Sequence, residues 1–417
     1  MRALIFEAAH RGHHLTYVRH LVPELLELGV DVVLVTSKTA AASTEYGQLI
    51  EPLLTGTQPS QLGSNRFTVD ADFDYAPRTN WQSTASRIRA LRERLRRYQP
   101  DFAYLPTADG ISQALGVGRW MGQGLKQGKC RLEAVVHNTR FAVPGRGLAD
   151  SLSSRMRLRA TAMAPWDRWY VVDCRAYQFL KDHCPGAARK CHLLPDPVEL
   201  LPALSTSEAR QRLELPCDGR YVGFCGLINA SKGFDRMIEA FDQAQLEPTD
   251  RILFAGRIDQ EMQSWLDKNA QHLIRDGRLI SLNRFLSFEE MHAALSAMDL
   301  VCIPYPRHAS ISSILLRAAA ARRPLLASDF GWIGYVTARF QLGTTCDLTR
   351  PDVFRETLRQ ALIAAPNYQW SPAAKQFSQF NSVENFAATW TQSLRSALGK
   401  PPSSALLPWE SVEAATS

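Results

Sequence analysis

Residues 3–35 read ALIFEAAHRGHHLTYVRHLVPELLELGVDVVLV, and this stretch decides the fold of the N-terminal half. An apolar strand runs into a short Gly/His turn, a helix follows from about Leu15 to Leu28, and Gly29 ends it before a second apolar strand begins. Two neighbouring parallel strands need such a helical crossover. We therefore expect a doubly wound α/β sheet.

The same alternation continues along the chain and then starts again. FAYLPT (102–107), EAVVHN (133–138) and RWYVVD (168–173) predict more strands of the first half. After the prolines at 195 and 197, four apolar runs predict a second α/β half: RYVGFCG (220–226), DRILFAG (250–256), DLVCIPY (299–305) and RPLLAS (323–328). Two such halves form a ligand crevice at the carboxyl ends of their strands.

The chain of 417 residues suits two domains. We predict an N-terminal domain over 1–196 and a C-terminal domain over 197–375. An amphipathic helix within about 376–398 is expected to cross back to the N-terminal domain, and a flexible tail rich in Pro, Ser and Ala is expected over 399–417.

Composition limits the class of protein. With 45% apolar and 21% charged residues the chain is globular, and its opening apolar run is too short for a leader or a membrane span, so we expect a cytoplasmic protein. The eight cysteines show no paired spacing, which favours a reducing compartment. His183-Cys184 and Cys191-His192 match no zinc spacing, and we expect no metal.

The segment RIRALRERLRRY (87–98) carries six arginines. Ile88, Leu91 and Leu95 recur at helical spacing, which predicts an amphipathic helix with a basic outer face. Such a face is usually solvated surface. Peripheral contact with anionic lipid at the inner face of the membrane, or with an anionic acceptor, is the alternative.

Three loops are candidates for binding an anion such as a diphosphate. GLINASKG (226–233) presents Lys232 between a strand and a helix. Ser312 and Ser313 open the helix ILLRAAAA, whose free N–H groups can hold phosphate oxygens or simply be capped. The turn at Gly12 lacks the three glycines of a dinucleotide fingerprint, which disfavours a hydride-transfer cofactor.

Two further side chains follow strands at the expected sheet edges. His137 ends EAVVHN, where it could face a sugar or a leaving phosphate, with a purely structural role as the competing interpretation. Arg257 ends FAGR at the equivalent edge of the second sheet and could add a cation there.

In their order, several segments resemble the retaining glycosyltransferases of family 4, from about residue 1 to 398. The resemblance is carried by residues 3–35, AVVHN, WDRWYVV, LLPDPVEL, GLINASKGFDRMIEAF, ILFAG, FLSFEEMHAALSAMDLVCIPY and LLRAAAARRPLLASDFG. It implies two facing Rossmann-like domains, the glycosyltransferase-B (GT-B) fold, with the nucleotide-sugar donor bound mainly by the C-terminal domain and the acceptor mainly by the N-terminal one.

The resemblance also implies roles for individual residues. Lys232 falls on the diphosphate-binding lysine, His137 on a histidine near the donor sugar, and Gly12 on the glycine loop over the leaving phosphate. Phe285 and Leu286 align with a loop whose backbone holds the nucleobase. No metal and no cofactor beyond the nucleotide sugar is implied.

Three positions depart from the family pattern. The family has an arginine where this chain has Leu227, and it has glutamates for the donor sugar and ribose where this chain has Ala309 and Arg317. Arginine cannot accept hydrogen bonds from ribose hydroxyls. Our hypothesis is that His308 and Arg257 take over sugar and phosphate contacts.

We therefore expect a hexosyltransferase that acts with retention and without metal. Its partners would be a nucleotide-sugar donor and a sugar, lipid-linked or small-molecule acceptor, with no nucleic acid; the oligomeric state stays open. Two alternatives remain. One is a catalytically impaired relative acting as a binding subunit, and the other is an inverting transferase or epimerase on the same fold, with Asp109 or His137 as general base.

Overall fold

The computed structural model describes residues 1–10, 14–55, 66–74, 80–121, 125, 128–142, 148–229 and 232–414. The described chain divides into two compact units. The N-terminal unit comprises Met1–Pro197 and Glu384–Leu406, and the C-terminal unit comprises Val198–Val383 and Leu407–Ser417.

The N-terminal unit is built on a seven-stranded sheet in the order β3-β2-β1-β4-β5-β6-β7. All neighbouring strands in it pair in parallel. Its strands are β1 (Arg2–Phe6), β2 (Asp31–Val35), β3 (Phe67–Asp70), β4 (Phe102–Leu105), β5 (Arg131–Val136), β6 (Arg168–Val171) and β7 (Cys191–Leu193). Its helices are α1 (His14–Glu27), α2 (Lys38–Ala41), α3 (Thr44–Leu49), α4 (Glu51–Thr55), α5 (Asn80–Tyr98), α6 (Ile111–Trp120), α7 (Leu148–Met163), α8 (Cys174–His183), α9 (Pro185–Ala188) and α19 (Val383–Ala397), with a 3-10 turn over Arg140–Ala142.

The C-terminal unit has a six-stranded sheet in the order β10-β9-β8-β11-β12-β13, again with parallel pairing throughout. Its strands are β8 (Tyr221–Cys225), β9 (Arg251–Ala255), β10 (Leu279–Leu282), β11 (Leu300–Ile303), β12 (Leu325–Ser328) and β13 (Gly343–Cys346). Its helices are α10 (Thr206–Arg212), α11 (Phe234–Asp242), α12 (Gln260–Asn269), α13 (Gln271–Arg275), α14 (Phe288–Ala297), α15 (Ser313–Ala320), α16 (Gly331–Arg339), α17 (Pro351–Ala364), α18 (Pro372–Phe380) and α20 (Trp409–Ala414), with a 3-10 turn over Ala365–Asn367.

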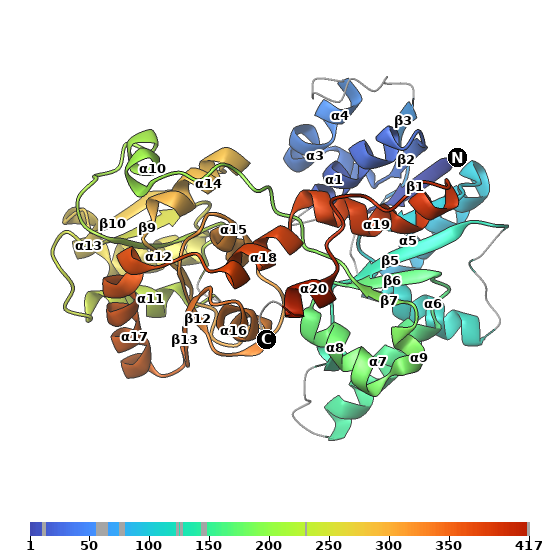
Figure 1. The fold of residues 1–417 in the computed structure, drawn as a ribbon. Helices are drawn as coiled ribbons and strands as arrows, with labels where there is room; N and C mark the ends of the chain where they lie inside the picture. Colours follow the sequence, from blue (N-terminus) through green and yellow to red (C-terminus); the bar gives the residue numbers. More distant parts are fainter. Residues whose placement is uncertain are drawn as a thin grey trace. The chain divides into compact units, whose positions relative to one another are not determined.

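The central strands form the core of each unit. β4, β8 and β11 are buried at every position, as expected for parallel strands with helices on both faces. Figure 1 shows helices around both sheets. The predicted fold class of two doubly wound α/β halves is therefore confirmed.

The C-terminal segment differs from the single helix expected over 376–398. α18 ends at Phe380, and α19 starts at Val383. The break falls at Asn381 and Ser382, because the Asn381 side chain donates to the carbonyl of Phe377 and Ser382 pairs with Val198 as an isolated bridge. α18 thus belongs to the C-terminal unit, whereas α19 packs on the N-terminal sheet (Figure 1).

The last described residues are more ordered than the flexible tail expected from 399. Trp409–Ala414 form α20, and both Trp409 and Val412 are buried. The Trp409 ring packs edge-on against Phe340 and Phe380 of the C-terminal unit. Trp409 and Val412 are spaced as on one face of a helix, and this pattern indicates a helix that the Pro, Ser and Ala content of the segment did not.

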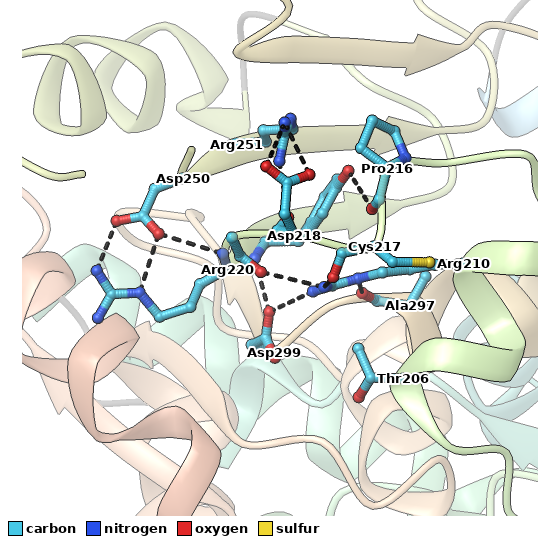
Figure 2. Close-up of polar contacts among 12 residues, drawn as sticks. Thr206, Arg210, Pro216, Cys217, Asp218, Arg220, Asp250, Arg251, Ala297 and Asp299 are labelled. Atoms are coloured by element: carbon cyan, nitrogen blue, oxygen red, sulfur yellow. Dashed lines mark hydrogen bonds and ion pairs between the residues drawn. The ribbon is translucent and has the colours of Figure 1, made fainter. Parts of the chain in front are cut away.

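An ionic network ties the C-terminal sheet together at the amino ends of its strands (Figure 2). The guanidinium of Arg210 donates to Asp299 at 2.6 Å and to the carbonyls of Cys217, Gly219 and Ala297. Asp299 in turn accepts the peptide N–H of Tyr221. The network is structural, since the carboxyl ends of parallel strands, where ligands bind, lie at the opposite edge.

The arginine-rich helix predicted over 87–97 is confirmed within α5, but not all of its arginines lie on the solvent-exposed face. Arg94 is buried and paired with Asp70, and Arg87 donates to the carbonyl of Thr107. Arg89, Arg96 and Arg97 are exposed. Among the described residues, no helix is both long enough and apolar enough to span a membrane.

Candidate functional site

Lys232 lies in the loop between β8 and α11, at the carboxyl edge of the C-terminal sheet. Its ammonium donates to the carbonyl of Leu227 at 3.0 Å and lies over the rings of Phe224 and Tyr305 at 5.8 and 5.4 Å. Burial lowers the pKa of Lys232. In the described part of the chain no carboxylate lies within 4.0 Å of it. This half-buried cation is therefore available to an anion.

Gly233 fixes the position of that lysine. It caps α11 with a φ of +79°, and a Cβ at this position would lie 2.4 Å from the carbonyl oxygen of Pro304. Only glycine permits this approach without displacing backbone. The end of β8 is thereby held against the end of β11, which brings Lys232 to Tyr305.

Tyr305 is the centre of the site, although the sequence pattern around it did not predict this. Its ring lies 5.4 Å from the Lys232 ammonium and 5.3 Å from the ring of His308. Burial raises its pKa, and a hydrogen bond with Ser312 acts in the opposite direction. Tyr305 thus joins the lysine, the histidine and the start of α15 into one cluster.

His308 and the serines complete this edge. Burial lowers the pKa of His308, a hydrogen bond at the Ile311 backbone raises it, and the nearby Lys232 charge lowers it. Ser312 is the N-cap of α15 and accepts from the N–H of Leu315 at 3.4 Å, so it has the capping role considered above. Ser313, the first helical residue, is exposed. A neutral histidine, an ammonium and a helix start suit a phosphate with an attached sugar.

The loop after β9 lies next to the lysine loop. Ile228 donates to the carbonyl of Arg257, and Ile228 bridges to Ile258. The exposed guanidinium of Arg257 lies 6.0 Å from the Phe285 ring, which is 51% exposed, whereas Leu286 is buried. Arg257 and Phe285 therefore offer a planar cation and an open aromatic face beside the lysine loop.

Arg317 has a partner of its own. Its guanidinium lies 3.3 Å from the carboxylate of Glu199 and over the Phe288 ring at 4.9 Å. Both members of the ion pair are largely buried. The position where the family resemblance implies a ribose-binding glutamate thus presents an arginine with its charge paired by Glu199. Ala309 offers no polar side chain.

His137 lies at the carboxyl edge of the N-terminal sheet, directly after β5. Its Nε2 lies 2.9 Å from the carbonyl oxygen of Pro106, and since a carbonyl only accepts, Nε2 carries the hydrogen. Burial lowers the pKa of His137 to about 4, with the hydrogen bond to Pro106 opposing and the charge of His14 assisting. The imidazole is therefore neutral at neutral pH and has a defined tautomer.

A second histidine near His137 was not singled out in the sequence. His14 Nδ1 lies 3.1 Å from the buried carboxylate of Glu7 and 2.9 Å from the Thr107 hydroxyl. Burial alone would lower the pKa of His14, but the charge of Glu7 and its hydrogen bond raise it overall. Burial likewise opposes ionisation of Glu7, and His14 prevails, so that the pKa of Glu7 is lowered. The pair thus favours an imidazolium beside a carboxylate.

Asp109 lies on the same edge, after β4. Its carboxylate accepts the peptide N–H of Asn138 at 3.0 Å. Burial raises the pKa of Asp109, and the N–H groups of Asn138 and His137 partly offset that rise. The edge of the N-terminal sheet therefore combines the carboxyl groups of Glu7 and Asp109 with two histidines, of which His14 is favoured in its charged form and His137 is neutral.

Two predicted features remain apart from these clusters. Gly12 lies outside the described residues, so the expected glycine turn is not tested. Among the residues that are described, no group of three or more His, Cys, Asp or Glu side chains is arranged to hold a metal. All eight cysteines are free thiols.

Comparisons with known proteins bear on both units. A family model described as "Glycosyl transferases group 1" matches residues 219–362, which contain β8 and the Lys232 loop. The chain is a glycosyltransferase with the GT-B fold. No curated protein sequence matches it.

Solved structures resemble this glycosyltransferase over nearly its whole length. Anabaena HepE in complex with UDP shares 15% identity over 95% of this chain and 100% of its own, with a TM-score of 0.66. Sucrose-phosphate synthase from Thermosynechococcus elongatus shares 16% identity over 96% and 99%, with a TM-score of 0.67. WaaG, described as a glycosyltransferase involved in lipopolysaccharide biosynthesis, shares 15% identity over 96% and 100%, with a TM-score of 0.62. At these identities the likeness establishes the fold.

Proposed function

We propose that this glycosyltransferase moves a hexose from a nucleoside diphosphate sugar to a sugar, lipid-linked or small-molecule acceptor, with retention and without a metal. The donor is supported by the solved relatives, since HepE structures contain UDP and UDP-glucose. The reaction breaks the bond between the anomeric carbon and the leaving phosphate oxygen. The acceptor oxygen bonds to that carbon, and its proton passes to the leaving phosphate.

The observation that carries the proposal is the state of Lys232. A half-buried ammonium whose hydrogen-bond acceptor is a neutral carbonyl, at the carboxyl edge of a parallel sheet, is incompletely compensated. A departing diphosphate supplies the missing negative charge. Because the cation is already in place, its interaction grows as charge develops on the leaving oxygen, and this is what accelerates a reaction.

The other residues of the edge have complementary roles in this proposal. The N–H groups at Ser312 and Ser313 hold phosphate oxygens, since the first turn of α15 has free donors. His308 binds a sugar hydroxyl as a neutral imidazole. Arg257 and Phe285 contact the nucleoside or its phosphate, and the backbone at Leu286 holds the base.

The N-terminal edge is proposed to orient the sugar and take the acceptor. His137 is neutral, and its hydrogen bond to Pro106 fixes the orientation of the ring beside the proposed sugar site. In this proposal the imidazolium of His14, held in place by Glu7, faces the reacting groups. The free cysteines agree with action in a reducing compartment such as the cytoplasm.

The experiment that tests the function is a panel of nucleoside diphosphate sugars incubated with the full chain and mixed acceptors. Donor consumption that requires an acceptor, persists in EDTA and yields a product with the donor's anomeric configuration supports the proposal. Product of inverted configuration would establish an inverting transferase instead. A ligand present at 100 times its Kd also raises stability by about 2.7 kcal/mol, so a thermal-shift screen selects the base first.

A binding subunit without turnover is favoured by one observation, the Arg317–Glu199 ion pair at the position expected for a ribose ligand. A carboxylate paired with arginine has fewer lone pairs for ribose. Nucleoside diphosphate binding combined with no donor consumption across the panel would select this second function.

A further inference from the structure

An arginine-lined groove lies between α5 and α6 on the N-terminal unit. The groove encloses about 860 Å³ and is lined by Arg89, Arg92, Arg96 and Arg97, with Ile88 and Leu115 among its apolar residues. All of these residues belong to helices α5 and α6. We call this feature the arginine groove. Its walls combine concentrated positive charge with apolar surface.

Arginines outnumber the acidic residues in the lining of the groove. The acidic residue in its lining, Glu93, is paired with the buried Arg94 at 2.8 Å. Arg97 reaches Asp70 at only 3.8 Å. The Nε of Arg92 is buried and has no hydrogen-bond partner in the described part of the chain. The groove therefore concentrates positive charge and N–H donors on one face of the N-terminal unit.

An exposed apolar strip continues from the groove. Val117 lies on α6 and Met121 directly after it, and Leu152 and Met156 lie on α7 with 60% and 63% exposure. Gly116 brings the two helices together, because a Cβ there would lie 1.7 Å from the carbonyl oxygen of Ala160. The strip on α6 and α7 is thus continuous with the helix that forms one wall of the groove.

Further arginines accompany the strip. Arg119 on α6 and Arg155 and Arg159 on α7 are exposed. Large exposed apolar side chains among arginines are unfavourable in water alone, but they match the boundary of an anionic bilayer, where headgroups meet acyl chains. A nucleic acid would use the arginines and leave the leucine and methionines exposed. A free phosphate would fill only part of the groove.

We propose that the arginine groove and the apolar strip dock the enzyme on an anionic phospholipid membrane. The arginines bind phosphate groups of the lipid, while Leu152, Met156, Val117 and Met121 insert among the headgroups. This surface is formed by the N-terminal unit alone. It is distinct from the proposed donor site, and its test does not depend on the identity of donor or acceptor.

The test is co-sedimentation of the full chain with vesicles of phosphatidylcholine, alone or mixed with an equal amount of phosphatidylglycerol. We expect binding to the anionic vesicles that weakens as salt is raised, and little binding to the neutral ones. Each basic residue near such a surface contributes about a five-fold gain, so Arg89→Gln with Arg96→Gln should weaken binding about 25-fold. Leu152→Ser with Met156→Ser should weaken it at all salt concentrations.

The matched control removes two exposed arginines from the C-terminal unit, Arg212→Gln with Arg275→Gln, which changes the net charge equally. Circular dichroism and thermal unfolding verify that each variant is folded. Equal loss of vesicle binding in the control and the groove variant would overturn the proposal, because it would show a net-charge effect. Equal binding to neutral and anionic vesicles, or retention of inorganic phosphate or RNA without vesicle binding, would also overturn it.

Discussion

Replacing Lys232 by methionine keeps the length of the side chain and removes its charge. In the structure the ammonium is half-buried, donates to the carbonyl of Leu227 and lies over two aromatic rings. Methionine can still fill the space over Phe224 and Tyr305, so we expect the fold to survive. What is lost is the cation that is proposed to face the leaving diphosphate.

The magnitude follows from the role of that cation. Loss of one preorganised group that stabilises developing negative charge costs about 2–4 kcal/mol of transition-state free energy. This corresponds to a decrease of about 30- to 900-fold in kcat/KM. Lys232→Arg should also lose activity, since the larger guanidinium does not fit between the rings and the carbonyl as the ammonium does.

The assay is release of nucleoside diphosphate under steady-state conditions, with the donor chosen by the thermal-shift screen. Lys268→Met, an exposed lysine on α12, is the control for loss of one charge. If Lys232→Met remains folded and keeps kcat/KM within about three-fold of the unchanged protein, Lys232 does not stabilise the leaving group.

Three further predictions concern stability. The folded-state pKa of His137 is about 4, below its ordinary value of 6.5, so the unfolded chain binds more protons between about pH 4 and 6.5. The free energy of unfolding therefore falls as the pH drops through this range. His137→Gln should remove about 2 kcal/mol of this loss at about pH 5, as measured by urea unfolding. Burial raises the pKa of Glu133 to about 7, so this carboxyl opposes folding increasingly as the pH rises from about 4.5 to 7. Glu133→Gln should therefore increase the free energy of unfolding by about 2 kcal/mol more at about pH 8 than at about pH 5. An equal increase at both pH values would contradict the assignment. Arg210→Ala should cost about 3–5 kcal/mol, because it leaves the carboxylate of Asp299 uncompensated; an unchanged melting temperature would argue against the network of Figure 2.

The sequence predicted the fold where elements are long and apolar. β1, β8 and β11 are continuous apolar runs with turn signals at their ends, and their periodicity suffices. The short strands β7 (CHL) and β13 (GTTC) were not predicted, because three or four residues carry too little pattern. Their pairing comes from a neighbouring strand that is already in place.

The candidate site was only partly predictable for the same reason. Lys232 stands out because a loop between a strand and a helix is visible in one sequence. Tyr305 follows β11 just as directly, but an aromatic residue after an apolar run resembles core. The pairs Arg317–Glu199 and His14–Glu7 depend on which loops meet in space, and only the folded chain shows that.

The measurement that tests the central claim most directly is calorimetric titration of the full chain with a nucleoside diphosphate and with the matching uncharged nucleoside. Charge-assisted contacts to the phosphates at the Lys232 edge should make the diphosphate bind at least about ten-fold more tightly, which equals about 1.4 kcal/mol. In Lys232→Met most of this advantage should disappear, while the affinity for the nucleoside stays the same. Equal affinities of the unchanged protein and Lys232→Met for the diphosphate would contradict the account.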